Sequence, residues 1–236
     1  MQEISNKVVL ITRGSKGIGL GVAKALKQQG LKVAITSRRQ KDADEAAASL
    51  GGDVLAIEAD VKDFGSQQET VKKVVAHFGK LDILIANAGV GHFGSIEELG
   101  LDQWHDIIDT NLTGVFYSIK ASLEELKSSS GYIFTISSLA GTNFFAGGSA
   151  YNASKFGLTG FSQAIMLDLR NYGIKVTTIM PGSVATYFND HQPDEEKDAW
   201  KIQPQDIGQL ITDLLKMHPR TLPSKVEVRP TKTSNS

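Results

Sequence analysis

The sequence predicts an α/β fold in which a parallel sheet of about seven strands is covered by helices on both faces. Short apolar runs rich in β-branched residues alternate with longer segments whose apolar residues recur at helical spacing. The runs are almost free of polar residues, as expected for strands buried on both faces. Strands that alternate with helices pair in parallel through right-handed crossovers. No repeat or linker divides the chain, so we expect one domain over residues 1–230 and a disordered tail over 231–236.

The first half of the chain supplies four predicted strands, at residues 7–12, 32–37, 54–59 and 81–86. The first strand runs through a glycine-rich turn into a helix that ends near Gly30, since glycine is favoured just beyond a helix C-terminus. A second helix is expected at residues 41–50, where Gly51 and Gly52 follow it. A third, at 65–78, has an apolar stripe made mostly of valines.

The second half continues the alternation with strands at residues 132–137, 174–180 and 224–229. Between them, long helices are expected from Asp102 to about Leu126 and from Ala150 to Tyr172, and a last helix at residues 204–217. In such a sheet the ligand crevice lies at the carboxyl ends of the strands, near the point where the strand order reverses. The segments that follow the strands are therefore the candidate functional segments.

Composition excludes several kinds of site. The net charge is −1, with 41% hydrophobic and 22% charged residues, which gives no reason to expect nucleic-acid or membrane partners. The chain has no cysteine, so disulfides, thiolate chemistry and cysteine-based zinc sites are excluded. Its 5 histidines show no metal-ligand spacing, and we expect no metal. No signal-peptide layout and no apolar run of roughly 18 residues is present, so a cytoplasmic location is expected.

Tyr151 and Lys155 are four residues apart and would lie on one face of a helix. A phenol with a pKa near 10 exchanges protons poorly at neutral pH, and a nearby ammonium is expected to lower that pKa. Ser138 follows a predicted buried strand and could bring its hydroxyl to the start of the same helix. A Tyr-x-x-x-Lys pair alone is weak evidence, because such pairs are common on helix surfaces.

Two turns point to a nucleotide. The turn from Gly14 to Gly19 opens a helix after the first strand, where backbone N–H groups can approach a pyrophosphate. The turn after the second strand carries Ser37, Arg38 and Arg39, and no acid occurs before Asp42. A cation at this turn pairs with a 2′-phosphate, whereas a carboxylate would bind the ribose diol. We therefore predict NADP(H) rather than NAD(H), the alternative being that the two arginines form only a solvated turn.

Together these segments resemble the short-chain dehydrogenase/reductase family from about Lys7 to Pro230. The family's Thr-Gly-x-x-x-Gly-x-Gly element corresponds to Thr12 through Gly19, and its Asn-Ala-Gly element to Asn87-Ala88-Gly89. The helix asparagine corresponds to Asn111, the active-site serine to Ser138, and the Tyr-x-x-x-Lys pair to Tyr151 and Lys155. The Pro-Gly segment that wraps the nicotinamide corresponds to residues 181–186. Each match is weak alone, but the whole set in this order is specific.

The resemblance implies a Rossmann-type fold and assigns roles. Tyr151 would protonate a carbonyl oxygen while NADPH delivers hydride to its carbon, and Ser138 would hydrogen-bond that oxygen. Lys155 would lower the tyrosine pKa and bind the nicotinamide ribose, and Asn111 would fix a water leading to solvent. The cofactor-binding set it implies is Arg13, Gly14, Ser15, Lys16, Gly17, Ile18, Gly19, Ser37, Arg38, Arg39, Asp60, Val61, Asn87, Ala88, Gly89, Tyr151, Lys155, Pro181, Gly182, Val184 and Thr186.

Arg13 departs from the family pattern, which has its first glycine at this position. A side chain here could crowd the adenosine or demand an unfavourable backbone angle. Three outcomes are open: the tight turn moves to Gly14, Arg13 points outward and binds phosphate, or cofactor binding is weakened. We expect the first two together.

The substrate is expected to be a small-molecule carbonyl compound: a ketone, an aldehyde, a β-keto ester or a 3-oxoacyl compound. Residues 90–96, 139–149 and 185–203 should line its pocket, with few charged anchors. Five aromatic residues in these segments suggest an apolar pocket, although each could simply pack a loop: Phe93, Phe144, Phe145, Tyr187 and Phe188. Residues 187–200 carry five carboxylates and are expected to form a polar, mobile lid with little hydrophobic anchoring.

Other activities stay open at this stage. A catalytically impaired NADP-binding regulatory protein is suggested by Arg13, and an epimerase, dehydratase or dehalogenase could use the same scaffold. The expected activity is that of a carbonyl reductase or ketoreductase. The family assembles through its two long helices, so we expect a homotetramer, or a homodimer. Phe161, Ala164, Ile165 and Leu169 would suit either such an interface or the domain's own core.

Overall fold

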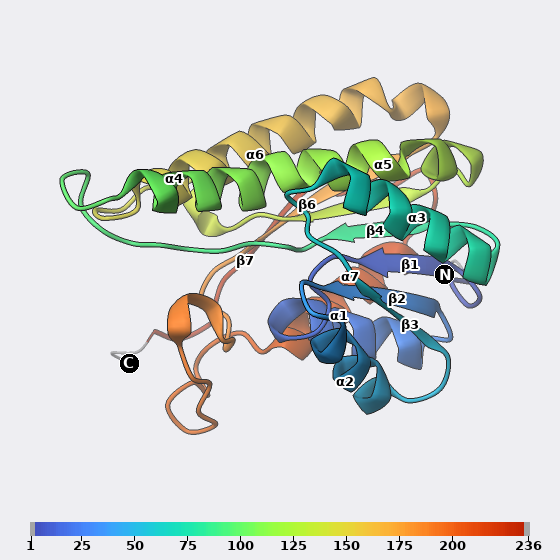
Figure 1. Ribbon diagram of the computed structural model, residues 1–236, viewed down its shortest axis with the longest axis horizontal. Helices are drawn as coiled ribbons and strands as arrows, with labels where there is room; N and C mark the ends of the chain where they lie inside the picture. The colour runs from blue at the N-terminus through green and yellow to red at the C-terminus, as the bar shows by residue number, and fades with distance from the viewer. Residues whose placement is uncertain (1–2, 234–236) are drawn as a thin grey trace.

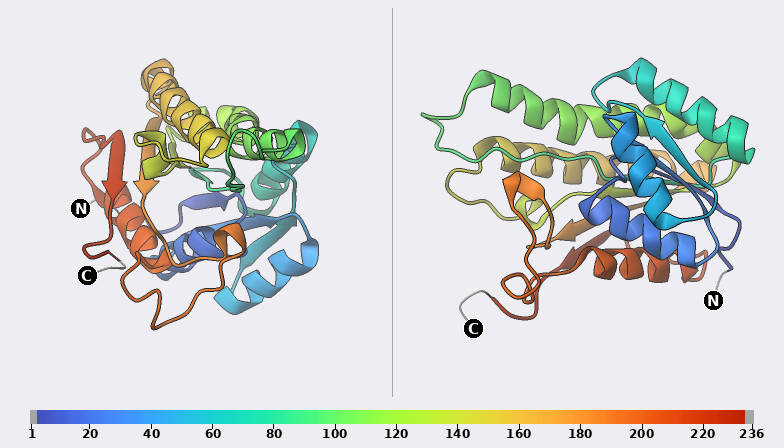
Figure 2. Two further views of the ribbon diagram at one scale, coloured as in Figure 1. Left: turned by 90° about the vertical axis from the view of Figure 1, so that its left-hand side faces the viewer. Right: turned by 60° about the horizontal axis from the view of Figure 1, so that its bottom comes forward.

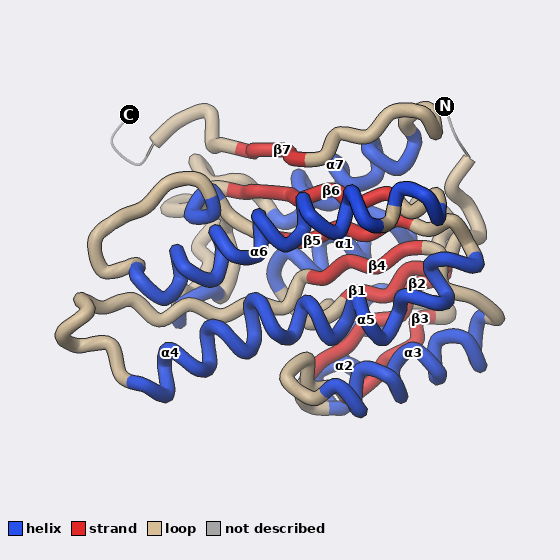
Figure 3. The backbone as a smooth tube through the Cα atoms, turned by 90° about the horizontal axis from the view of Figure 1, so that it is seen from above, coloured by secondary structure: helices blue, strands red, loops and turns tan. Residues whose placement is uncertain are grey.

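The computed structural model describes residues 3–233, apart from the side chain of Asp190. Its seven strands form one sheet in the order β3-β2-β1-β4-β5-β6-β7, and every neighbouring pair is parallel (Figure 3). The strands are β1 (Val8–Ile11), β2 (Lys32–Ser37), β3 (Val54–Glu58), β4 (Ile83–Ala86), β5 (Tyr132–Ile136), β6 (Lys175–Pro181) and β7 (Lys225–Val228). The predicted doubly wound fold is confirmed, with its order reversing between β1 and β4.

Helices cover both faces of the sheet (Figure 1). They are α1 (Gly17–Gln28), α2 (Gln40–Leu50), α3 (Phe64–Phe78), α4 (Leu101–Ile108), α5 (Gly114–Ser128), α6 (Ser149–Asp168) and α7 (Pro204–Lys216). In Figure 1 α3, α4, α5 and α6 lie above the sheet, while α1, α2 and α7 lie below it. Each face has its own apolar core: Leu26 and Ile211 pack against one, and Val74 and Leu158 against the other.

The central strands are buried on both sides because their side chains alternate between these two cores. Along β1, Val9 and Ile11 enter the core that contains α1 and α7, while Val8 and Leu10 enter the core that contains α3, α5 and α6. All four side chains are at most 1% exposed. An uninterrupted apolar run therefore predicted this strand correctly.

The long helix expected from Asp102 to about Leu126 is interrupted. One turn of π-helix (η1, Asp109–Thr113) separates α4 from α5. A π-turn inserts a residue into the helical ladder and often occurs at functional sites. Here the inserted turn contains Asn111, one of the four predicted catalytic residues, and its side chain is fully buried.

The carboxyl ends of the strands gather at one end of the molecule, which the left view of Figure 2 faces. The segment between β6 and α7 projects there, as an orange loop apart from the two layers in Figure 1. Of the tail predicted to be disordered, residues 231–233 are described and exposed, and 234–236 lie outside the described residues.

Candidate active site

The site begins where β1 and β4 end side by side at the reversal of strand order. The hydroxyl oxygen of Thr12 accepts hydrogen bonds from the backbone N–H groups of Asn87 (3.0 Å) and Ala88 (3.1 Å). In return the Asn87 side-chain amide donates to the carbonyls of Thr12 (3.0 Å) and Arg13 (3.1 Å). A threonine and an asparagine at these places are therefore explained by local structure, since together they join the two turns that open the cleft.

Ser138, Tyr151 and Lys155 line one cleft of about 1140 Å³ at this end of the sheet. Ser138 follows β5, and its hydroxyl oxygen accepts a hydrogen bond from the N–H of Ala140 at 3.1 Å. Tyr151 lies on the first turn of α6, and Lys155 lies one turn further on. The Lys155 ammonium donates to the carbonyl of Ile136 at 3.0 Å and lies 5.7 Å from the centre of the Tyr151 ring.

Burial dominates the proton affinity of both groups. It raises the pKa of Tyr151 to about 12, and the hydrogen bond with the Ser138 hydroxyl offsets only part of that rise. Burial also lowers the pKa of Lys155 to about 8, because a desolvated ammonium is disfavoured. The expectation that the ammonium lowers the tyrosine pKa is thus wrong for this structure, in which the phenol is a protonated donor at neutral pH.

Asn111 lies behind the cleft rather than in it. Its side-chain oxygen accepts from the N–H of Val90 (2.8 Å), and its amide donates to the Val90 carbonyl (2.9 Å) and the Ser154 hydroxyl (3.0 Å). Both amide protons are therefore used within the protein. The residue ties the loop after β4 to α6, and the water-binding role that the family resemblance implies for it stays a prediction.

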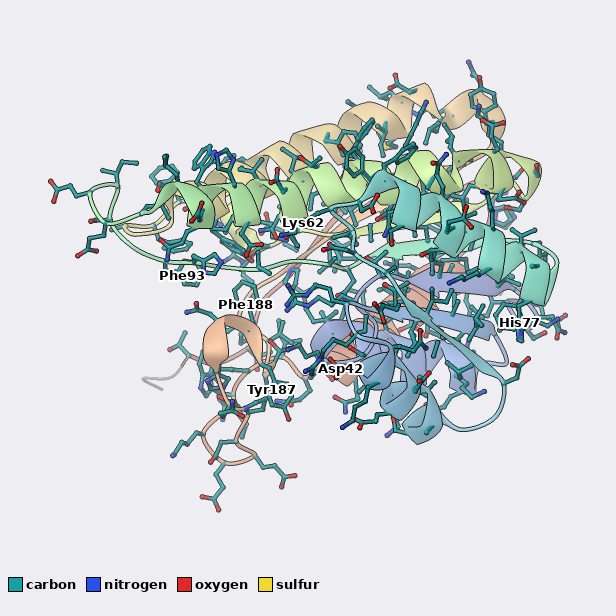
Figure 4. All side chains as sticks on the ribbon, viewed as in Figure 1. Asp42, Lys62, His77, Phe93, Tyr187 and Phe188 are labelled. Carbon is teal, nitrogen blue, oxygen red and sulfur yellow. The ribbon has the colours of Figure 1, made fainter. Side chains whose placement is uncertain are left out.

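Aromatic rings pack against the ring of Tyr151. The Phe93 ring packs against Tyr151 at 5.4 Å and Phe145 at 5.7 Å, and the Phe188 ring lies 5.6 Å from Tyr151, all between ring centroids. Phe93 and Phe188 reach this place from the loops after β4 and β6, and Figure 4 shows them near one another. Phe144 and Tyr187 also line the cleft. The five predicted aromatic residues thus all line the cleft that contains Tyr151.

The segment expected to be a loosely anchored lid is anchored at two places. Phe188 packs so closely on Gly91 that a Cβ there would lie 2.5 Å from its ring. The carboxylate of Asp198 is 3% exposed and pairs with Lys201 (2.7 Å) and His191 (2.5 Å), which hold its pKa well below the usual range. The expectation of a purely polar, weakly held lid is therefore not met.

The first turn fits a phosphate group. Helix α1 begins at Gly17, whose φ of 56° is in the left-handed region that glycine tolerates. The side chain of the N-cap residue Lys16 does not cap the first backbone N–H groups of α1. Lys16, Gly17 and Ile18 all line the cleft. A helix N-terminus with a lysine beside it suits a pyrophosphate.

The two arginines of the turn after β2 make different contacts. Arg39 forms a bidentate ion pair with Asp42, at 2.7 and 2.8 Å, and does not line the cleft. Arg38 lines a second, small cavity together with Ser37, Asp60 and Val61. Within the described residues no carboxylate pairs with Arg38. Of the two arginines, Arg38 is therefore the one whose side chain can interact with an anion in that cavity.

The structure overturns the expected relocation of the tight turn to Gly14. Arg13 itself has a φ of 50°, whereas Gly14 does not have a positive φ. The N–H groups of Arg13 and Gly14 donate to the hydroxyl and carbonyl oxygens of Thr36, at 3.1 and 2.9 Å, and fix this geometry. A Cβ at Gly14 would lie 2.7 Å from Ile35, so the second position needs glycine for packing. The arginine side chain points inward and donates to the carbonyl of Gly89, which contradicts the outward orientation.

Most predicted cofactor residues lie on one of the two cavities. The large cleft is lined by Arg13, Lys16, Gly17, Ile18, Asn87, Gly89, Tyr151, Lys155, Pro181, Gly182, Val184 and Thr186. The small cavity is lined by Arg13, Ser37, Arg38, Asp60, Val61 and Ala88. Gly14, Ser15, Gly19 and Arg39 line neither.

Sequence reasoning missed the part of the cleft formed after β7. The cleft is also lined by Arg229, Pro230 and Lys232, together with Lys201. The signal was present, because a seventh strand predicted to be parallel delivers its following residues to the same end of the sheet as the others. These cations correct the expectation of few charged groups around the pocket.

Within residues 3–233, no group of three or more histidine, aspartate or glutamate side chains is arranged to bind a metal ion. None of the helices in that range combines the length and apolar character needed to cross a bilayer.

Comparison with known proteins matches residues 7–197 to the family model for short chain dehydrogenases. An uncharacterised oxidoreductase of Staphylococcus epidermidis is 30% identical over 98% of this chain and its own full length. A 3-oxoacyl-[acyl-carrier-protein] reductase of Staphylococcus aureus is 35% identical over 84% of this chain and 82% of its own. The crystal structure of an alcohol dehydrogenase from Thermococcus sibiricus, complexed with 5-hydroxy-NADP, is 30% identical with a TM-score of 0.88, covering 96% of this chain and 97% of that one.

Proposed function

The chain belongs to the short chain dehydrogenase family of oxidoreductases, and from that premise we propose that it reduces a ketone or aldehyde to an alcohol with NADPH. One observation carries the proposal. A protonated phenol, Tyr151, lies in the cleft beside the rings of Phe93 and Phe188, with the Ser138 hydroxyl as its hydrogen-bond partner. Two neutral hydroxyl groups that can donate to the same substrate oxygen suit a reaction in which that oxygen gains negative charge.

The roles of the side chains follow from this arrangement. When bound, NADPH would supply the hydride. Tyr151 would donate its proton to the substrate oxygen, and Ser138 would orient that oxygen by a hydrogen bond. Because burial raises the pKa of Tyr151 to about 12, the hydroxyl carries its proton at neutral pH and is present in the form that the reductive direction requires.

Lys155 places a buried positive charge beside the forming anion. Its ammonium is oriented by the Ile136 carbonyl, and with a pKa of about 8 it stays mostly protonated at pH 7. A cation in a desolvated site stabilises developing negative charge more strongly than it would in water. Asn111 acts as a positioning residue that holds the loop after β4 against α6.

The choice of NADP(H) over NAD(H) rests on the unpaired guanidinium of Arg38 and on Lys16 nearby. Arginine recognises phosphate through paired N–H donors, and the turn after β2 carries no carboxylate that would bind a ribose diol. The related alcohol dehydrogenase whose structure contains 5-hydroxy-NADP agrees with this choice. The substrate is proposed to be a ketone, β-keto ester or 3-oxoacyl compound, because the cleft is apolar around Tyr151 and a 3-oxoacyl reductase is among the relatives.

A homotetramer or homodimer and a cytoplasmic location stay predictions. The residues named for an interface divide: Leu169 is buried, Phe161 and Ile165 pack against the protein's own core, and Ala164 is exposed. The large apolar side chains that α5 and α6 do expose are Phe116, Phe156 and Leu167. We propose these as the oligomer interface.

The test is NADPH oxidation, followed by absorbance, against a panel of ketones, β-keto esters and 3-oxoacyl thioesters. Tyr151→Phe should lower turnover about a hundredfold or more while NADPH affinity changes little. Ser149→Ala, at the start of the same helix, is a matched control that should keep full activity. Near-wild-type turnover of Tyr151→Phe would refute the assignment. Tight NADPH binding without oxidation of any carbonyl would favour the alternative suggested by Arg13, a cofactor-binding protein without catalysis.

A further inference from the structure

Arg13 is the one described residue that lines both cavities. Its backbone is fixed by Thr36 on one side and by the Asn87 amide on the other. From this fixed point the side chain crosses from the end of β1 to the carbonyl of Gly89 beyond the end of β4. The side chain therefore lies across the place where the strand order reverses, between the turns expected to bind adenosine and the side of the cleft expected to bind nicotinamide.

The cavity on the adenosine side is too small for its expected ligand. It measures about 30 Å³, room for only one or two water molecules, and it is lined by the turns that follow β2 and β3, by the loop after β4 and by Thr110. The cleft on the nicotinamide side measures about 1140 Å³. The residues thus fit the pyrophosphate and nicotinamide as they stand, whereas binding of an adenosine requires the Arg13 side chain to move. Relatives with glycine at this position would have no side chain lying between the two cavities.

The surroundings of Arg13 indicate what would move it. Burial lowers the pKa of its guanidinium, and so does the neighbouring charge of Arg38, while Asp106 acts in the opposite sense. Two guanidinium groups near one another, with no carboxylate paired to Arg38, repel each other and would both be satisfied by one dianion. A phosphate ester on the adenosine ribose is such a dianion.

We propose that the Arg13 side chain closes the adenosine half of the cofactor cleft, and that the 2′-phosphate of NADP(H) opens it. The phosphate draws the guanidinium from the Gly89 carbonyl toward Arg38, so that Arg13 becomes a second cation on the phosphate. A nucleotide without that phosphate must break the same hydrogen bond between Arg13 and the Gly89 carbonyl, but it gains no ion pair with Arg13. The inference rests on the proposed NADP(H) preference and makes Arg13 a determinant of that specificity.

Gly89 links this movement to the catalytic residues. A Cβ at Gly89 would lie 3.5 Å from the Asn111 side-chain oxygen and 3.6 Å from the Lys155 ammonium, so Gly89 is a near neighbour of both groups. Release of its carbonyl by Arg13 frees an acceptor next to the nicotinamide side of the cleft at the moment when the adenosine side fills.

Two adenosine fragments, 2′,5′-ADP and 5′-AMP, test the inference by titration calorimetry on the full chain. Arg13→Gly suits the positive φ and removes both the side chain that lies between the cavities and its positive charge. It should bind 5′-AMP about fivefold more tightly than the wild type, and its preference for 2′,5′-ADP over 5′-AMP should fall about tenfold. Arg13→Lys should keep more of that preference than Arg13→Met, which has similar bulk and no charge. Thermal unfolding of each variant verifies folding.

Arg38→Met is the control that separates the two effects, because it should reduce the preference without improving 5′-AMP binding. Unchanged 5′-AMP affinity in Arg13→Gly would show that the side chain obstructs nothing, and an unchanged preference would show that it does not meet the phosphate. Either result overturns the inference. Neither depends on carbonyl turnover, so failure of the proposed reductase activity would be seen separately in the NADPH oxidation assay.

Discussion

Replacing Lys155 with methionine should make the protein more stable at neutral pH while it removes activity. The ammonium is fully buried, and burial lowers its pKa from 10.5 to about 8. A lysine whose folded-state pKa is depressed is destabilising while the unfolded chain is charged, so its cost is greatest at low pH and is relieved as the pH rises from 8 to 10.5. A shift of this size corresponds to about 3 kcal/mol at pH 7.

The pH dependence of the effect is the informative quantity. By pH 9.5 the unfolded lysine is itself close to titration, and the cost falls to about 1 kcal/mol. Methionine has a similar length and no charge, and it leaves the Ile136 carbonyl without its donor, a loss of about 1–3 kcal/mol that is the same at both pH values. The stability of Lys155→Met relative to wild type should therefore decrease by about 2 kcal/mol between pH 7 and pH 9.5.

Urea unfolding of both proteins at one fixed protein concentration measures this difference, because oligomers unfold in a concentration-dependent way. Lys24→Met, on α1, is a control in which an exposed lysine is lost and no such pH dependence is expected. A relative stability that stays constant from pH 7 to pH 9.5 would refute the reasoning, since it would mean that Lys155 is not desolvated in the folded protein.

Three further substitutions test a ring beside Tyr151, the ion pair that anchors residues 187–200 and the N-terminal cap of α3. Phe188→Ala should raise KM for the carbonyl substrate about tenfold, because a large apolar ring is lost beside the phenol; a KM within twofold would place the substrate elsewhere. Asp198→Asn should weaken the ion pair with Lys201, raise KM about three- to tenfold and increase proteolysis of residues 187–200, and equal cleavage rates would contradict this role. Asp63→Ala removes the cap that accepts from Gly65 and Ser66 and should lower the free energy of unfolding by about 1 kcal/mol in urea.

Local pattern predicted the strands well because their burial on two faces leaves a simple apolar signature. It predicted the helix from Asp102 less well. The break at Asp109–Thr113 leaves no mark in the spacing of apolar residues, since the π-turn is stabilised by contacts of the Asn111 side chain with Val90 and Ser154, far apart in the sequence. Propensity carries no information about such distant hydrogen bonds.

The chemistry of the site divides in the same way. The types and order of Ser138, Tyr151 and Lys155 could be recognised in the sequence, but their proton affinities could not. The sequence places an ammonium near a phenol, which by itself argues for a lowered pKa, whereas the folded protein buries both and reverses that result.

The sequence by itself determined the fold, the strand ends at which the site lies and the residues that carry its chemistry, because periodicity and residue type are local properties. Only the tertiary structure decided how Arg13 is used. A residue with a positive φ is fixed by partners on other strands, and its side chain could have pointed either way from that turn. Packing between the ends of β1 and β4 directs it across the cleft, and that direction is a property of the assembled sheet alone.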